Sequence, residues 1–375
     1  MNPEELRRQY QILNELLKEH YDSSVGEVYC PESIELREFG FAFFIGQFRR
    51  HISFKHGRDL HSYIQQALPK DVYYSVASYR RAAAPMADKG WMEAELPFDL
   101  DAEQVLRTDD PLVKDGWISN IYYEEIKREL FKLLDNFIEA DFGLTSRDYT
   151  IAFSGGRGFH VRITDRVFKE LGSQFRRQIV EHVALGHMPE WAPAKRGAIA
   201  PFTHDYGWDL RTFSWLKNRV VAHRDRSSPT HLPLRIVSQL ATASKPTELC
   251  VRRTDRKVLD EYLREAMNNL TVAIDERVTV DLNRLLRAAG SVHGGSGLVC
   301  KILSKTDLDG FEPLTSAVMN LRSSKRLLVE NVPLRVEIKG ESLGPSDKGK
   351  SIEVNSALAY YVVVRRGAKF DIKAI

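Results

Sequence analysis

Two aspartates placed two residues apart in the segment Glu95-Leu96-Pro97-Phe98-Asp99-Leu100-Asp101-Ala102 constrain this chain more than any other feature. The surrounding apolar residues predict a buried strand, and side chains alternate between the two faces of a strand, so Asp99 and Asp101 share one face. Two carboxylates on one face repel each other unless a cation lies between them. Mg²⁺ and Mn²⁺ prefer hard oxygen ligands, so the segment predicts a divalent metal site. A solvated strand end is the alternative, and the pair alone does not decide.

Composition sets wide bounds. The chain has 375 residues, of which 43% are hydrophobic, so it can bury a sizeable core as one large domain or as two to three smaller ones. A net charge of +3 is too small to indicate nucleic-acid binding by itself. Basic stretches interleaved with aromatic residues, such as 211–226, are typical of surfaces that bind phosphates and bases, and also of solvated helix faces.

The cysteines and the apolar runs bear on location. Cys30, Cys250 and Cys300 stand far apart and form no Cys-x-x-Cys pair, so we expect a reducing compartment. The apolar run over 39–46 is far shorter than the roughly 20 residues of a membrane span, and no secretion signal opens the chain. We therefore expect a soluble intracellular protein that does not enter a membrane.

The spacing of apolar residues predicts helices and strands in mixed order. Helices are expected over 3–17, 126–137, 165–185, 254–268 and 281–287, and strands over 39–44, 72–79, 95–101, 149–153, 278–280, 334–338 and 360–364. Gly143 suits the left-handed position after a helix. Residues 189–201 and 224–233 predict loops. The pattern indicates an α+β (mixed α/β) fold.

A glycine-rich turn, Ser154-Gly155-Gly156-Arg157-Gly158-Phe159-His160, joins two predicted strands. A Walker loop and a dinucleotide fingerprint would each open a helix instead, so both are excluded. Glycines let backbone N–H groups approach an anion, and Ser154, Arg157 and His160 can add donors to phosphate oxygens. A tight hairpin without a ligand is the alternative.

A third segment runs from Asp275 to Gly295. It carries Asp275 and Asp281, then Arg284 and Arg287 on the predicted helix, then His293 in a loop. Helix capping is the simpler role for Asp281, so Asp275 is the better third metal ligand. His293 could bond a phosphate or sugar oxygen, although a lone histidine is more often structural.

Together these residues resemble the small, catalytic subunit of DNA primase of the archaeal and eukaryotic type. The resemblance is carried by Arg37–Phe41, Tyr73–Ala77 with Lys89–Trp91, Phe98–Ala102, Ser154–His160 and Asp275–His293. It implies that Asp99, Asp101 and Asp275 bind two catalytic Mg²⁺ or Mn²⁺ ions. It also implies nucleotide binding by Ser154, Gly155, Arg157, His160, Arg287 and His293, and a place near the active site for Arg50.

Two departures from that family pattern stand out. Relatives usually carry a Cys/His zinc stem soon after the acidic strand, but residues 104–120 contain neither residue, so we predict no zinc and a turn at Asp109-Asp110-Pro111 in its place. Phe48 stands where some relatives have tyrosine. The missing zinc stem leaves the metal triad untouched, while the change at position 48 bears on a sugar contact.

The resemblance implies a fold with an RRM-like sheet beside a second α/β unit and helical decorations. We expect a catalytic domain over 1–325 with a helical, basic insertion at about 165–270, and a small β-rich element over 326–375. It implies primer synthesis for replication on single-stranded DNA from NTPs, with dNTPs as further candidate substrates, a large iron-sulfur partner subunit, and a cytoplasmic, nucleoid-associated location. The alternatives are a non-replicative primase-polymerase and an inactive nucleic-acid-binding module.

Overall fold

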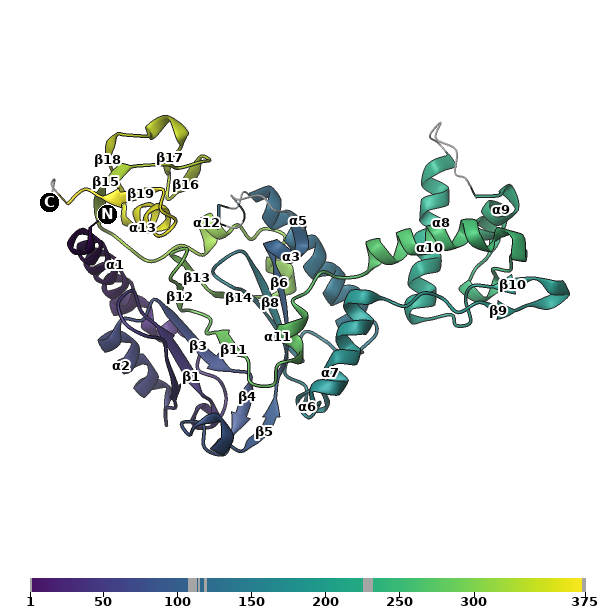
Figure 1. Cartoon of the computed structure of the whole chain (residues 1–375), viewed down its shortest axis with the longest axis horizontal. Helices are drawn as coiled ribbons and strands as arrows, with labels where there is room; N and C mark the ends of the chain where they lie inside the picture. The colour runs from purple at the N-terminus through teal and green to yellow at the C-terminus, as the bar shows by residue number, and fades with distance from the viewer. Residues whose placement is uncertain (1, 107–112, 114, 118–119, 225–231, 373–375) are drawn as a thin grey trace. The chain divides into compact units, whose positions relative to one another are not determined.

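The computed structural model describes residues 2–106, 113, 115–117, 120–224 and 232–372 (Figure 1). Contacts divide the chain into a first unit, Met1–Leu130 with Thr145–Arg176 and Ile274–Ile375, and a second unit, Phe131–Leu144 with Arg177–Ala273. Helices and antiparallel sheets occur in mixed order, which confirms the predicted α+β class. The domain boundaries expected from the sequence stay predictions, and the predicted turn at 109–111 lies outside the described residues.

Within the described residues, the first unit contains a four-stranded antiparallel sheet, which we call the β1 sheet. Its strand order is β11 (Leu285–Arg287), β3 (Asp71–Ser75), β1 (Phe39–Ala42), β2 (Arg49–Ile52). Helix α1 (Pro3–Ser24) begins where the Asn2 side chain accepts a hydrogen bond from the Glu5 N–H. Helix α2 (Gly57–Ala67) brings Tyr63 against Phe41 of β1, with ring centroids 4.6 Å apart.

A second antiparallel sheet of the first unit, the β6 sheet, carries the acidic strand. Over the described residues its order is β14 (Lys301–Leu303), β7 (Tyr149–Phe153), β8 (Gly158–Ile163), β6 (Leu96–Asp101). Phe98 and Leu100 are fully buried, whereas Asp99 and Asp101 on the other face are partly exposed, as the alternation predicts. Helix α5 (Asn120–Leu133) continues in a π-helical turn (Leu134–Glu139), and Gly143 follows with a left-handed φ of +69°.

Several predicted elements are wrong in type or extent. Residues 72–79 form two strands, because β3 ends at Ser75 and β4 (Ala77–Tyr79) pairs instead with β5 (Trp91–Ala94). Residues 276–280 form helix α11 (Glu276–Val280), where a strand was expected, and β11 replaces the helix expected over 281–287. Residues 360–364 belong to helix α13 (Ser356–Val364). In α11 and α13, a capping side chain and burial override the β-branched composition that favours strands.

The remaining elements of the first unit are short. They are α3 (Ala102–Leu106), α6 (Arg166–Lys169), β12 (Val292–His293), β13 (Leu298–Val299), α12 (Pro313–Ser316), β15 (Ser324–Val329), β16 (Val336–Ile338), β17 (Glu341–Leu343), β18 (Ser351–Asn355) and β19 (Ala368–Phe370). Strands β18, β15 and β19 form a small sheet beside α13 near the C-terminus. Helix α7 (Ser173–Val180) leads into the second unit.

The second unit is mainly helical. Helices α8 (Gly207–Arg224), α9 (Leu234–Thr242) and α10 (Arg256–Leu270) surround a core that includes Leu216, Leu240 and Leu263. The short strands β9 (Ala192–Pro193) and β10 (Ile199–Ala200) pair as an antiparallel ribbon within the predicted loop at 189–201. Most of the other predicted loop, 225–231, lies outside the described residues. Among the described helices, none has the length and apolar character required to cross a bilayer.

Candidate active site

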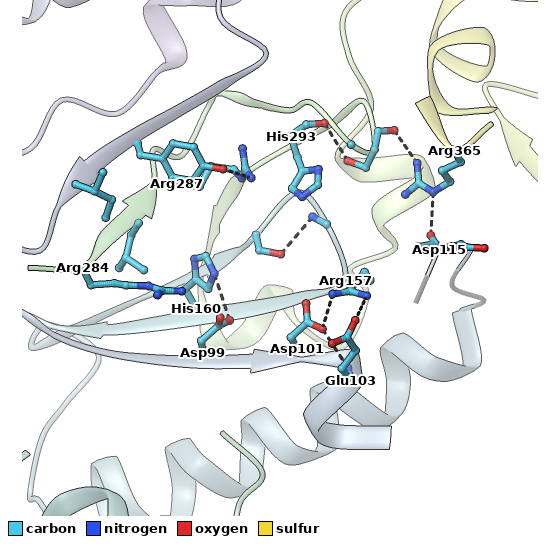
Figure 2. Close-up of a pocket in the computed structure, with 18 residues that line it drawn as sticks. Asp99, Asp101, Glu103, Asp115, Arg157, His160, Arg284, Arg287, His293 and Arg365 are labelled. Atoms are coloured by element: carbon cyan, nitrogen blue, oxygen red, sulfur yellow. Dashed lines mark hydrogen bonds and ion pairs between the residues drawn. The ribbon is translucent and has the colours of Figure 1, made fainter. Parts of the chain in front are cut away.

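A pocket of about 410 Å³ opens in the first unit, lined by residues of the β1 sheet and the β6 sheet (Figure 2). Seven residues predicted from the sequence line it: Asp99, Asp101, Ser154, Arg157, His160, Arg287 and His293. Gly155, Asp275 and Arg50 do not line it. The fold therefore brings together side chains from β6, the β7–β8 turn, β11 and β12.

The acids of β6 face basic side chains of the neighbouring strand and turn. Asp99 is paired with His160 in the β6–β8 ladder, and His160 Nε2 lies 3.3 Å from Asp99 Oδ1. Arg157 Nη2 lies 3.3 Å from Asp101 Oδ1 (Figure 2). Each acid of the predicted metal pair thus contacts a basic side chain of the predicted phosphate-binding segment.

Arg157 also binds a residue that the sequence reasoning missed. Its Nη1 atom lies 2.5 Å from Glu103 Oε1, on α3 directly after the acidic strand. Burial raises the pKa of Asp101, and the nearby Asp99 charge adds to that effect, while Arg157 opposes it. Two desolvated carboxylates on one strand face are a donor set that fits a hard divalent cation.

The glycine-rich turn is a strand-to-strand hairpin, as predicted. Gly155 has a φ of +79°, and a Cβ atom there would lie 2.8 Å from His293 Cβ, so the position requires glycine. The Gly156 N–H donates to Ser154 Oγ at 3.2 Å, and the Ser296 hydroxyl donates to the Gly155 carbonyl. These contacts fix the turn against the loop that carries His293.

The opposite wall carries Arg287 and His293. Arg287 binds the Asp71 carboxylate, donates to the Tyr73 hydroxyl at 3.1 Å, and lies 4.9 Å from the Tyr73 ring centroid. The Nδ1 atom of His293 is buried and has no hydrogen-bond partner among the described residues. Burial and the charges of Arg287 and Arg365 hold the pKa of His293 well below its usual value. An anion in the pocket would oppose this effect.

Arg365, which no sequence pattern had singled out, adds a further cation to the pocket. It directly follows α13. Its Nε atom donates to the Gly116 carbonyl at 2.8 Å, and its Nη1 atom donates to the Ser296 carbonyl at 3.1 Å. Its guanidinium carbon lies 3.6 Å from the Tyr361 ring centroid. Among the described residues it forms no ion pair, although Asp115 lines the same pocket, so a buried charge faces the pocket without a paired carboxylate.

Asp275 lies beside the acidic strand but outside the pocket lining. Its N–H donates to the Asp99 carbonyl at 2.9 Å, while its own Oδ1 accepts from the Arg277 N–H at 3.0 Å and so begins α11. Over the described residues, no three or more His, Cys, Asp or Glu side chains converge as a ready metal site. A divalent metal in this pocket would have Asp99 and Asp101 as candidate ligands, with Asp275 adjacent through its backbone.

Arg50 does not line the pocket and forms an ion pair with Glu38. It lies on β2, at the edge of the β1 sheet opposite β11, and its Nε atom is 2.8 Å from Oε1 of the buried Glu38. The Glu38 carboxylate raises the pKa of Arg50 through hydrogen bonding and charge. Arg50 is held in an ion pair on that edge, and contact with a nucleotide stays a prediction.

The fold and pocket define an α+β protein in which an acidic strand faces a cationic, glycine-rich hairpin. Comparison with known proteins gives the family. Residues 98–304 match the family described as DNA primase small subunit, and that match includes every predicted site residue except Arg50. The chain belongs to the DNA primase small subunit family, which confirms the resemblance noted from the sequence.

Archaeal relatives match over most of their length. The chain is 35% identical to the DNA primase small subunit PriS of Methanoregula boonei over 318 residues, covering 77% of this chain and 80% of the relative. It is 31% identical to PriS of Archaeoglobus fulgidus over 366 residues, covering 96% and 98%. It is 34% identical to PriS of Halobacterium salinarum over 312 residues, covering 75% and 78%.

Proposed function

We propose that this chain is the catalytic subunit of a DNA primase, a nucleotidyltransferase that copies single-stranded DNA into short primers for replication. The observation that carries the proposal is the contact of Asp99 with His160 and of Asp101 with Arg157 in one pocket. Metal-binding acids and phosphate-binding cations must be adjacent in nucleotidyl transfer, because the metal and the protein share the same phosphate oxygens.

Asp99 and Asp101 would hold Mg²⁺ or Mn²⁺, with Asp275 as a third ligand. When bound, a pair of such ions lowers the pKa of the attacking 3′-hydroxyl and neutralises the pyrophosphate that leaves. The residues present fit this role because both carboxylates lie on one strand face and line the pocket. Asp275 would contribute by turning its carboxylate, now the cap of α11, toward β6.

Basic and polar side chains of the pocket would hold the triphosphate of the incoming nucleotide. Arg157, His160 and Ser154 approach from the β7–β8 turn, and Arg287 and His293 from the opposite wall. We add Arg365 to this set, because its charge has no carboxylate partner among the described residues. Charge-assisted hydrogen bonds to phosphate are about twice as strong as neutral ones, so these side chains would dominate nucleotide affinity.

Initiation needs two nucleotides bound at once, and one triphosphate pocket accounts for only one of them. We propose that a large, iron-sulfur partner subunit contributes to that first step, as the family resemblance implies. NTPs and dNTPs are both candidate substrates, because Arg157, His160 and Arg365 would contact phosphate rather than sugar. The proposed setting is the cytoplasm at the nucleoid.

De novo synthesis is the test of this function. Purified chain, with and without a large subunit, is mixed with unprimed single-stranded DNA, Mg²⁺ or Mn²⁺ and labelled nucleotides. The proposal predicts dinucleotides and short products, lost in Asp101→Asn. Extension of a supplied primer without any de novo product indicates a non-replicative primase-polymerase, and template binding without incorporation indicates an inactive binding module.

A further inference from the structure

The segment 177–273 of the second unit carries an excess of positive charge. Residues 177–273 contain fifteen Lys and Arg against ten Asp and Glu, while the whole chain contains 54 against 51. The segment therefore holds more than the net charge of the chain. Arg211, at the start of the basic stretch noted in the sequence, is mostly buried, and its Nη2 atom lies 2.7 Å from Asp141 Oδ2. Arg211 therefore does not belong to an exposed phosphate-binding face.

An exposed basic surface lies elsewhere in the same unit, at the β9–β10 ribbon. The tip of the ribbon carries Lys195 and Arg196, both exposed, and Arg196 has a left-handed φ of +58°. In Figure 1 this tip extends away from α8 and α10 of the unit. A narrow, projecting ribbon with a cationic tip can follow a groove or a strand of nucleic acid without steric conflict.

A second basic segment runs beside this ribbon. Val251 pairs with Ile199 of β10 through two backbone hydrogen bonds of 2.8 and 2.9 Å. The antiparallel pairing directs the residues after Val251 toward the ribbon tip. The exposed cations that follow are Arg252, Arg253, Arg256 and Lys257. With Lys195 and Arg196 they form the ribbon patch.

The acids of this region differ in their partners. Asp255 is buried and accepts two hydrogen bonds from Arg235. Asp260 accepts from the Trp191 indole at 2.9 Å and lies 3.6 Å from Arg256. Glu190 and Glu261 are exposed. Of the ribbon patch, only Arg256 forms an ion pair within the described residues, so the other cations are available to an external anion.

We infer that the ribbon patch binds the sugar-phosphate backbone of single-stranded DNA. Clustered Arg and Lys side chains, most of them without an ion pair among the described residues, match a polyanion with regularly spaced phosphates, and nothing in the patch provides base readout. Arg256, 5.5 Å from the Trp191 ring centroid, presents a planar guanidinium suited to phosphate. The choice of single-stranded DNA as the polyanion rests on the proposed function.

Binding of a labelled single-stranded oligonucleotide, measured by fluorescence anisotropy over a salt series, tests the inference. Arg252→Gln with Arg253→Gln should weaken binding by roughly five- to tenfold at low salt. The slope of log K against log salt should fall in magnitude by about 1.4, because each phosphate contact on a single strand contributes about 0.7. Lys195→Gln with Arg196→Gln, at the exposed tip, should act similarly and guards against a folding defect in the first variant.

The matched control is Arg177→Gln with Arg264→Gln, which removes the same charge from exposed positions of the second unit outside the patch. Its affinity and salt slope should stay at the wild-type values. Equal losses in patch and control variants, or no loss in the patch variants, would overturn the inference. Nucleotide incorporation by the wild type, measured at saturating oligonucleotide, tests the proposed function separately. An inactive wild type would contradict the proposed function. The comparison of anisotropy between patch and control variants would still show whether the ribbon patch binds the oligonucleotide.

Discussion

Gly158 lies directly opposite Asp101 in the β6–β8 ladder, and a Cβ atom at position 158 would lie 2.8 Å from the Asp101 Cα. It would also contact the Leu100 carbonyl oxygen. The glycine therefore permits the acidic strand and the cationic turn to approach closely, so that Arg157 reaches Asp101. The identity of residue 158 in the sequence therefore affects the geometry of the pocket.

Gly158→Ala should separate β6 from β8. We expect a loss of about 2 kcal/mol or more in the free energy of unfolding, the cost of forcing atoms into a packed site, together with a loss of nucleotide incorporation. Urea denaturation and a primer-extension assay measure the two effects. Gly172→Ala is the control, since no atom lies within 4 Å of a Cβ built there, and a wild-type stability for both variants would contradict the geometry.

Arg157→Ala should weaken nucleoside triphosphate binding without weakening metal binding. Loss of a charge-assisted contact costs about 1.5–3 kcal/mol, or roughly 10- to 150-fold in affinity. Metal affinity should hold or rise, because Arg157 no longer competes for the Asp101 carboxylate. Nucleotide titration and Mn²⁺ titration report the two affinities, with the exposed Arg147→Ala as control. Unchanged nucleotide affinity would rule out the assigned role.

Arg365, which directly follows α13, is expected to contribute to nucleotide binding. Arg365→Gln removes the charge and should reduce nucleotide affinity by roughly tenfold, whereas Arg365→Lys keeps the charge and should retain most of it. The neighbouring Arg366 is exposed, so Arg366→Gln serves as the matched control. Equal affinity in the Gln and Lys variants would show that Arg365 acts only through packing. Nucleotide titration of folded protein, checked by circular dichroism, is the measurement.

His20 should make stability depend on pH. Burial, with a smaller effect of Lys339, lowers the pKa of His20 to about 4, and its Nδ1 atom accepts a hydrogen bond from the Asn320 N–H. The unfolded chain, in which this pKa is near 6.5, binds the proton more readily, so stability is full above that value and falls as pH drops toward 4.

Between pH 7 and pH 5 this difference amounts to about 2 kcal/mol of unfolding free energy. His20→Asn removes the titrating group and keeps an acceptor for the Asn320 N–H. The variant should therefore lose about 2 kcal/mol less than the wild type over that interval, as measured by urea denaturation at both pH values. Parallel losses would show that His20 is not buried as a neutral side chain.

Local sequence patterns predicted the acidic strand and the glycine-rich hairpin correctly. Alternation around Asp99 and Asp101 identified a strand with one acidic face, and the glycines after Phe153 indicated a hairpin, because these signals depend only on neighbouring residues. A strand was predicted at Val278-Thr279-Val280 because β-branched residues favour strands. In the structure, Asp275 caps a helical turn there, and Val278 and Thr279 are buried. The Asn355 cap and the helix formers Ala357 and Leu358 were signals available for α13.

Other parts of the site had no local signal. Arg365 meets the loop carrying Ser296 only through the tertiary fold, and its sequence neighbours resemble any surface turn. Asp71 and Tyr73, which hold Arg287, lie more than two hundred residues from it in sequence. Such contacts are set by which strands pair, and pairing between distant strands is what a single sequence specifies least visibly.

Metal-dependent nucleotide incorporation by Asp99→Asn and Asp101→Asn shows whether the acidic face of β6 binds the catalytic metal. Each change keeps the side-chain shape and removes one negative charge from the β6 face, so the fold should persist by circular dichroism. Loss of metal stabilisation worth several kcal/mol predicts a rate at least roughly a thousandfold lower than wild type on a primed template with Mg²⁺ or Mn²⁺. Incorporation at the wild-type rate by either folded variant would contradict the assignment of this strand as the catalytic metal site.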